Sequence, residues 1–161
     1  MIVISDTSII NNLAAIKQLQ LLQLLYGKIV VPDAVYAELI GPPLEAGAEE
    51  IVSYDWMTVR IVDDLNRVES LLSTGLHSGE SEVIALAIEL DADLILVDEK
   101  YARSTAEELG LNFTGIIGIL LDAKANDFIP EIRTYLSLLR EGANFWISDA
   151  LYQRALEIAS E

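Results

Sequence analysis

Short runs of β-branched and other apolar residues alternate along this chain with longer segments whose apolar positions recur at helical spacing. The runs IVIS, KIVV, MTVRIV, LILV and LNFT predict strands at residues 2–5, 28–31, 57–62, 94–97 and 111–114. The helical pattern predicts helices at 8–26, 33–41, 45–53, 64–73, 80–91, 100–109, 116–126, 130–141 and 148–159. Alternating strands and helices favour parallel pairing, so we expect an α/β fold. Its form would be a three-layer sandwich, with a central, mostly parallel sheet of about five strands flanked by helices.

Residues at the element boundaries support this division. Pro32 suits the first turn of a helix, and the GPP run at 41–43 would end that helix. Gly110 suits a left-handed helix stop, and Ser148 suits an N-cap.

Composition indicates one compact domain over residues 1–161. The chain has a mass of 17.7 kDa, is 52% hydrophobic and has a mean hydropathy of +0.38, which is enough for a packed core. No apolar run approaches the roughly 18–20 residues of a membrane span. The start, MIVISD, lacks the basic region of a signal peptide. Zero cysteines exclude disulfides and thiolate zinc sites, so we expect a cytoplasmic protein.

The chain is strongly acidic, with 26 Asp and Glu against 10 Lys and Arg, a net charge of −16 and a pI near 4.2. Such a balance fits a metal-dependent acidic site, a basic protein partner or simple solubility. It counts against broad, non-specific RNA binding, which normally relies on a basic surface.

Four carboxylates stand where the predicted sheet would bring them together. They follow or adjoin the strand ends, in the runs IVISD, VPDAVYAEL, GESEVIALA and LILVD: Asp6, Glu38, Glu82 and Asp98. The carboxyl ends of parallel strands share one edge, where open α/β folds place their ligands. Asp91 and Asp93 precede their strand, so we expect them in solvent at the opposite edge. Clustered carboxylates favour a hard divalent cation such as Mg²⁺ or Mn²⁺.

Simpler explanations exist for the first two acids. Asp6 could serve only as a turn or N-cap residue, with the hydroxyls of Thr7 and Ser8 beside it. Glu38 shares a helix face with apolar residues three and four positions back, which is unusual for an acid, although a surface glutamate would also fit.

The later acids also have alternatives. The helix dipole favours carboxylates in a first turn, which would explain either Glu80 or Glu82. Lys100 and Arg103 follow the last acid and could reach a substrate phosphate or form a solvated helix face. The single histidine, His77, lies in a polar run that predicts an exposed loop. Phosphate-binding glycine loops and a serine-nucleophile elbow are absent from the sequence.

The segments SDTSIINNL, VPDAVYAEL, GESEVIALA, LILVDEK and FTGIIGILLDAK together resemble a PIN domain over nearly the whole chain. The resemblance is to small single-domain PIN proteins of bacteria and archaea, which include VapC-type toxins. It implies a parallel sheet between helices, and three or four acids that bind Mg²⁺ or Mn²⁺. It also implies hydrolysis of RNA phosphodiester bonds, often by a homodimer silenced by an antitoxin protein.

The resemblance also implies roles for single residues. The four family acids correspond in order to Asp6, Glu38, Glu82 and Asp98. The hydroxyl that follows the first acid corresponds to Thr7 or Ser8.

The identity of the third and fourth acids stays open between neighbouring residues. The more familiar pattern places a hydroxyl residue after the later strand and an acid two positions on, whereas Asp98 follows the strand directly. Glu99 therefore competes with Asp98, and Glu80 competes with Glu82.

The resulting hypothesis is an Mg²⁺- or Mn²⁺-dependent endoribonuclease. In it, Asp6, Glu82 and Asp98 hold one or two ions, and Glu38 binds a second ion or orients the attacking water. The alternative is a non-catalytic PIN-fold module, whose acidic pocket is idle and whose surface binds a basic protein.

Overall fold

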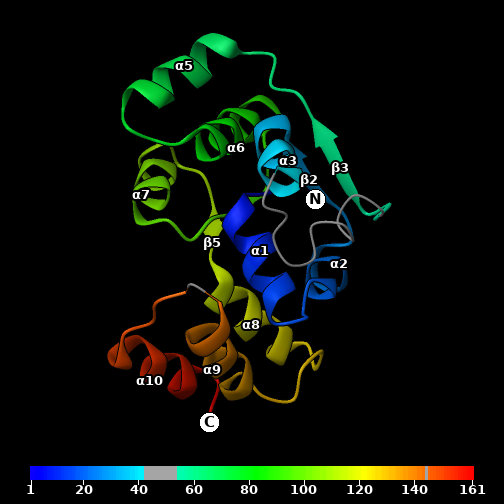
Figure 1. Cartoon of the computed structure of the whole chain (residues 1–161), viewed down its shortest axis with the longest axis vertical. Coiled ribbons are helices and arrows are strands. Elements are labelled where there is room, and N and C mark those ends of the chain that lie inside the picture. The colour runs from blue at the N-terminus through cyan, green and yellow to red at the C-terminus, as the bar shows by residue number, and fades with distance from the viewer. Residues whose placement is uncertain (42–53, 144) are drawn as a thin grey trace.

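A five-stranded, all-parallel sheet forms the centre of the protein (Figure 1). The computed structural model describes residues 1–41, 54–143 and 145–161, so the predicted helix at 45–53 lies outside the described residues. The strand order is β3-β2-β1-β4-β5. The strands are β1 (Val3–Ser5), β2 (Ile29–Pro32), β3 (Met57–Arg60), β4 (Leu94–Leu96) and β5 (Phe113–Thr114). The predicted α/β class and the five predicted strands are confirmed.

The first strand lies in the middle of the sheet. Ile4 pairs with Val30 on one side and with Ile95 on the other. The chain order reverses between β1 and β4, because β2 and β3 extend the sheet one way and β4 and β5 the other. This reversal is the topological switch point, where the helices after neighbouring strands diverge and leave room for a ligand.

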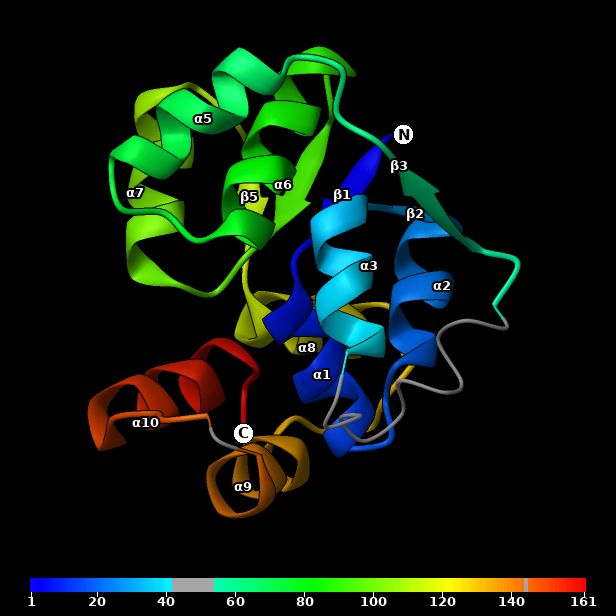
Figure 2. The same cartoon turned by 45° about the horizontal axis from the view of Figure 1, so that its top comes forward.

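Helices connect and cover the strands (Figure 2). Those described are α1 (Thr7–Ala15), α2 (Gln20–Tyr26), α3 (Asp33–Ile40), α5 (Leu65–Ser73), α6 (Ser78–Glu89), α7 (Lys100–Glu108), α8 (Ile116–Ala125), α9 (Arg133–Gly142) and α10 (Asp149–Ile158).

Helix α6 is the most deeply buried helix segment of the fold. Its residues 83–87, VIALA, are all fully buried because α6 packs against β1, β2 and β4 and is covered by α3, α5 and α7. Helices α2 and α8 contact each other and pack against β2 and β5, respectively. The apolar runs of β1, β2 and β4 are therefore covered by helices, as their continuous hydrophobicity predicts, whereas β3 at the edge of the sheet is mostly exposed.

The predicted helix at 8–26 is wrong in one respect, because the structure divides it into α1 and α2. Lys17 adopts a left-handed conformation with φ of 57°. Its N–H donates to the carbonyl of Ala14 at 3.0 Å, and that of Gln18 donates to Leu13 at 2.8 Å. These bonds close the end of α1. The apolar spacing runs on across this turn, and no glycine or proline marks it.

Other boundaries follow the sequence closely. Gly110 ends α7 with φ of 70°. The hydroxyl of Ser148 accepts from the N–H of Leu151 at 3.1 Å and caps α10. Both boundary predictions are confirmed.

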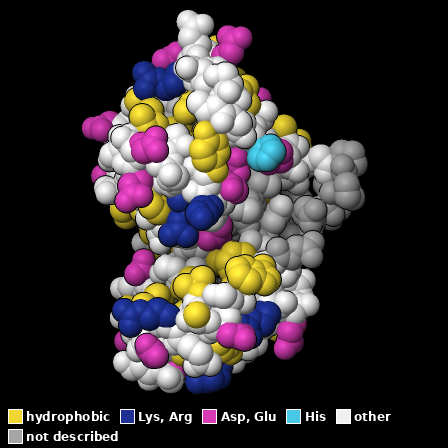
Figure 3. Space-filling view, turned by 90° about the vertical axis from the view of Figure 1, so that its left-hand side faces the viewer, with side chains coloured by type: hydrophobic (Ala, Val, Ile, Leu, Met, Phe, Trp, Pro, Cys, Tyr) yellow, Lys and Arg dark blue, Asp and Glu magenta, His cyan; other side chains and the backbone are white. Residues whose placement is uncertain are grey.

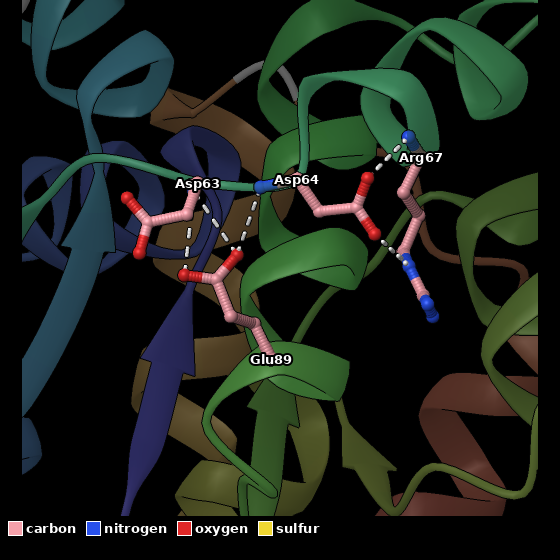
Figure 4. Close-up of polar contacts among 4 residues, drawn as sticks. All are labelled: Asp63, Asp64, Arg67 and Glu89. Atoms are coloured by element: carbon pink, nitrogen blue, oxygen red, sulfur yellow. Dashed lines mark hydrogen bonds and ion pairs between the residues drawn. The ribbon is translucent and has the colours of Figure 1, made fainter.

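Hydrogen bonds from backbone N–H groups to a side-chain carboxylate anchor the loop before α5 to the end of α6 (Figure 4). The carboxylate of Glu89 accepts from the N–H of Asp63 at 3.0 Å and from that of Asp64 at 3.3 Å. Asp64 in turn caps α5 by accepting from the N–H of Arg67 at 3.0 Å, and it pairs with the Arg67 guanidinium at 3.2 Å. These hydrogen bonds fix how α5 lies over α6.

The last described residue is tied to two helices of the lower end in Figure 1. The Glu161 carboxylate accepts from the N–H of Ile132 at 2.8 Å and from that of Arg133 at 3.2 Å, where α9 begins. It also pairs with Lys124 of α8 at 3.0 Å. Across the described ranges, no helix has the length and apolar character needed to cross a membrane.

Candidate functional site

Four helices begin beside the carboxyl edge of the sheet with an acidic side chain at or near their first turn. Asp6 caps α1 by accepting from Ile9 N–H at 3.1 Å, and Glu99 caps α7 by accepting from Ala102 N–H at 2.8 Å. Glu80 and Asp98 act similarly at α6 and α8: they accept from the N–H groups of His77 at 3.0 Å and Ile116 at 3.1 Å. The positive ends of these helix dipoles lower the cost of gathering several carboxylates there.

Asp6 is the most deeply buried of these acids, at 4% exposure. Its backbone N–H donates to the carbonyl of Leu96 at 3.0 Å, which places it directly between β1 and β4. Burial, helped by the negative charges of Asp98 and Glu80, raises the pKa of Asp6 to about 7, although hydrogen bonds from Ile9 and Ser8 act in the opposite direction. Ionised Asp6 is therefore costly unless a cation lies beside it.

Asp98 is the second residue after the end of β4. Burial raises its pKa to about 6, while the hydrogen bond from Ile116 and the charge of Arg103 act in the opposite direction. A Cβ at position 115 would lie 2.2 Å from an oxygen of Asp98, so only glycine leaves space for this carboxylate.

Glu38 reaches the same region from α3. Its carboxylate accepts from the hydroxyl of Thr7 at 2.5 Å. A Cβ at position 79 would lie 2.9 Å from its other oxygen, so Gly79 lets Glu38 approach the start of α6.

These side chains line a pocket of about 490 Å³ at the switch point. Its lining residues are Asp6, Thr7, Ser8, Glu38, His77, Ser78, Gly79, Glu80 and Glu99. These described lining residues include four carboxylates and no lysine or arginine. Asp98 lines an adjoining hollow, together with Arg103.

Glu82 does not enter this pocket. Its carboxylate accepts from the N–H of Ala34 at 2.9 Å, where α3 begins. Residues 80 and 82 are about 200° apart around a helix of 3.6 residues per turn, so only one of them can face the pocket. The structure brings Glu80 there. A sequence signal existed, because Glu80 is the third residue of the helix, the position from which an acid reaches back to the N-cap.

The remaining predicted residues fall on the rim or outside it. His77 is exposed, as predicted, but it lies at the start of α6 and lines the pocket. Asp91 and Asp93 are exposed at the opposite edge, as predicted. Lys100 and Arg103 lie on the exposed face of α7, and only Arg103 lines a hollow beside the acids.

The donor set fits a hard divalent cation. All the charged ligands are carboxylate oxygens, which Mg²⁺ and Mn²⁺ prefer, and Asp6 needs a positive charge to ionise cheaply at neutral pH. Within residues 1–41, 54–143 and 145–161, no three such side chains already converge as a finished ligand set. Glu38, Glu80 and Glu99 are instead engaged by the hydrogen bonds described above, which a bound cation would compete with.

Comparison with known proteins agrees with this geometry. A family model described as a PIN domain matches residues 2–161. No curated protein matches the chain. Because the family match spans nearly the entire sequence and the sheet and its acidic edge suit that fold, the chain belongs to the PIN-domain family, whose members are typically metal-dependent nucleases.

Proposed function

We propose that this protein is an Mg²⁺- or Mn²⁺-dependent endoribonuclease that hydrolyses RNA phosphodiester bonds. The observation that carries the proposal is the burial of Asp6 in a pocket with three further carboxylates and no lysine or arginine among its described lining residues. Family membership supports nuclease chemistry, and the pocket lies at the switch point of the sheet.

The proposal assigns the ligand roles to Asp6, Glu80 and Glu38, with Asp98 adjoining. Glu80 replaces Glu82 as the third acid because Glu82 is held by the start of α3. When bound, the cation would lower the pKa of water and stabilise the charge that develops on the phosphate.

The chain's own groups orient these acids. The hydroxyl of Ser8 donates to the Asp6 carboxylate at 3.1 Å, and the N–H of Ile9 does the same. Thr7 fixes Glu38, which we assign to accept a hydrogen bond from the attacking water and so orient it. Glu99 lines the rim and caps α7, where it adds negative charge.

The biological setting that we propose is a homodimeric toxin held inactive by an antitoxin protein. The net charge of −16 supports a basic partner, because opposite charges speed encounter between two proteins. The same charge implies that RNA binding relies on a small number of well-placed lysine or arginine side chains.

Calorimetry with Mn²⁺ tests the proposal without knowledge of the RNA target. Wild type should bind Mn²⁺, and Asp6→Ala should lose that binding while circular dichroism shows it still folded. A matched control is Asp91→Asn, which alters an exposed acid at the opposite edge of the sheet and should bind as wild type does.

RNA cleavage then separates the enzyme from the alternative. The wild-type protein should cleave RNA in the presence of Mn²⁺, and EDTA should stop this cleavage. Asp6→Ala should be inactive. If millimolar Mn²⁺ does not bind, or if Asp6→Ala binds it equally well, the metal site is refuted and a non-catalytic interaction module is the better explanation.

A further inference from the structure

The second hollow, beside the acidic pocket, has a different chemical character. It measures about 370 Å³ and lies between α7, β5, α8 and the segment that leads into α10. Its apolar lining includes Phe113, Ile117, Phe145, Trp146 and Leu151. Asp98 lines it too, and the proposed ribonuclease function assigns a role to no other residue of this hollow.

Trp146 is the most exposed large hydrophobic side chain among the described residues, at 84%. Its backbone is nevertheless anchored. The next residue, Ile147, is only 4% exposed, and its carbonyl accepts from the guanidinium of Arg140 at 3.4 Å. Ser148 then caps α10. An indole held in solvent by a fixed backbone has lost much of the freedom that binding would otherwise remove.

Arg103 supplies a cation on the same hollow. Its guanidinium lies 5.2 Å from the centre of the Phe113 ring, which holds it by a cation–π contact. Lys100 is exposed on α7 three residues earlier. Neither side chain belongs to any ion pair found among the described residues. Figure 3 shows the corresponding face of the molecule, on which basic side chains lie above a group of hydrophobic ones at a waist between the two ends.

Two glycines give the hollow its depth. A Cβ at position 118 would lie 2.1 Å from the Thr114 hydroxyl, and one at position 115 would meet Asp98. The resulting volume is at the lower end of the roughly 300–1,000 Å³ typical of small-ligand pockets.

We propose that this hollow binds one unpaired nucleotide of the RNA substrate, with its base stacked on Trp146 and its phosphate paired with Arg103. The inference rests on the proposed ribonuclease function. Asp98 is the shared element, because it lines the hollow and lies close enough to Asp6 to raise its pKa, so the next phosphodiester along the strand would reach the acidic pocket. Aromatic faces stack on any base, and a paired base cannot turn into such a site, so the protein should prefer single strands with little sequence selectivity.

The residues that line the hollow favour RNA over a second protein chain as the occupant. A hollow that joins an arginine to an exposed indole offers one partner for a phosphate and one for a base.

Intrinsic fluorescence tests the inference. The other tryptophan, Trp56, is 5% exposed and stacks on Tyr54, so the ligand-sensitive signal should come from Trp146. A mixed-sequence, single-stranded oligoribonucleotide in EDTA should quench wild type, and the same sequence as a duplex should not.

Variants identify the residues responsible, with affinity measured by anisotropy of a labelled oligoribonucleotide. Trp146→Ala should weaken binding by about 5- to 150-fold, the range for loss of one stacked base, and Trp146→Phe should largely restore it. Arg103→Gln should weaken binding and reduce its salt dependence. Phe128→Ala, an exposed aromatic outside the hollow, should bind as wild type does.

The outcomes separate this inference from the proposed function. Equal RNA affinity of wild type and Trp146→Ala overturns the inference, as does a dimer that becomes a monomer in Trp146→Ala while RNA binding is unchanged. If wild type cleaves RNA and Asp6→Ala does not, the proposed function stands even then. If Trp146 governs RNA binding but wild type never cleaves, the hollow stands and the ribonuclease proposal fails.

Discussion

Replacing Asp6 with asparagine should make the metal-free protein more stable at neutral pH. Asparagine is as good an N-cap as aspartate and keeps an oxygen for the N–H of Ile9, while it removes the group that resists ionisation. The variant should therefore retain the fold and lose the proposed metal site.

The magnitude follows from the pKa shift. Burial raises the pKa of Asp6 from 3.8 to about 7, roughly three units at about 1.4 kcal/mol each, or about 4 kcal/mol. The asparagine amide would lack a hydrogen-bond partner for its NH₂ group, which costs about 1 kcal/mol. The net gain in the free energy of unfolding is therefore about 3 kcal/mol. For a domain of this size that gain corresponds to a melting temperature about 6–12 °C higher.

The pH dependence has a definite sign. The pKa of Asp6 is raised in the folded state, so its stability contribution is complete below 3.8 and is lost as pH rises to about 7. The variant lacks this loss. The difference between the two proteins should be small near pH 4 and should reach its full size above pH 7.

Urea unfolding followed by circular dichroism in EDTA, at several pH values, measures this difference. Added Mn²⁺ should then stabilise wild type and leave Asp6→Asn unchanged. Asp91→Asn is the control, because residue 91 is exposed with φ of 50°, a conformation that asparagine tolerates. A variant that is less stable than wild type at neutral pH, or a difference that is constant with pH, would refute the reasoning.

Three further predictions concern neighbouring residues. Glu80→Gln should weaken Mn²⁺ binding in calorimetry, whereas Glu82→Gln should leave it intact and lower the free energy of unfolding by about 1 kcal/mol, because its carboxylate holds the start of α3; the reverse result would restore Glu82 as a ligand. Gly115→Ala should destabilise the protein by about 1–3 kcal/mol and weaken Mn²⁺ binding, because its Cβ would displace the Asp98 carboxylate, and an unchanged urea midpoint would contradict this. Glu161→Gln should lower the melting temperature at neutral pH. Hydrogen bonds from the start of α9 and from Lys124 outweigh burial and hold the pKa of Glu161 below its usual value, so the effect should vanish as the pH falls through that pKa. A destabilisation that persists in acid would contradict this.

Much of the fold could be predicted because each strand is a short, continuous apolar run followed by a clear break. The same pattern located Asp6 and Asp98, since residues that follow parallel strands must share one edge. Periodicity could not show the break at Lys17, because the apolar spacing continues through it and a lysine in a left-handed turn leaves no pattern in the sequence.

The spacing of residues along the sequence could not show which of two neighbouring acids faces the pocket, because that depends on the three-dimensional geometry. Whether Glu80 or Glu82 faces the pocket is fixed by where α6 begins, and that helix starts two residues earlier than its apolar positions indicate. Trp146 is harder still, because its exposure depends on how Arg140 and Ile147 anchor the backbone between two helices.

The central position of β1 has a consequence during synthesis on the ribosome. Val3–Ser5 is made before the other strands of the sheet, yet one of its two neighbours, Leu94–Leu96, is made some ninety residues later. Until then Asp6 lacks the wall that excludes water, and Glu80 and Asp98 have no fixed place beside it. A nascent chain that ends before β4 would therefore lack the proposed activity, which would appear only when the carboxyl-terminal half of the sheet closes on the first strand.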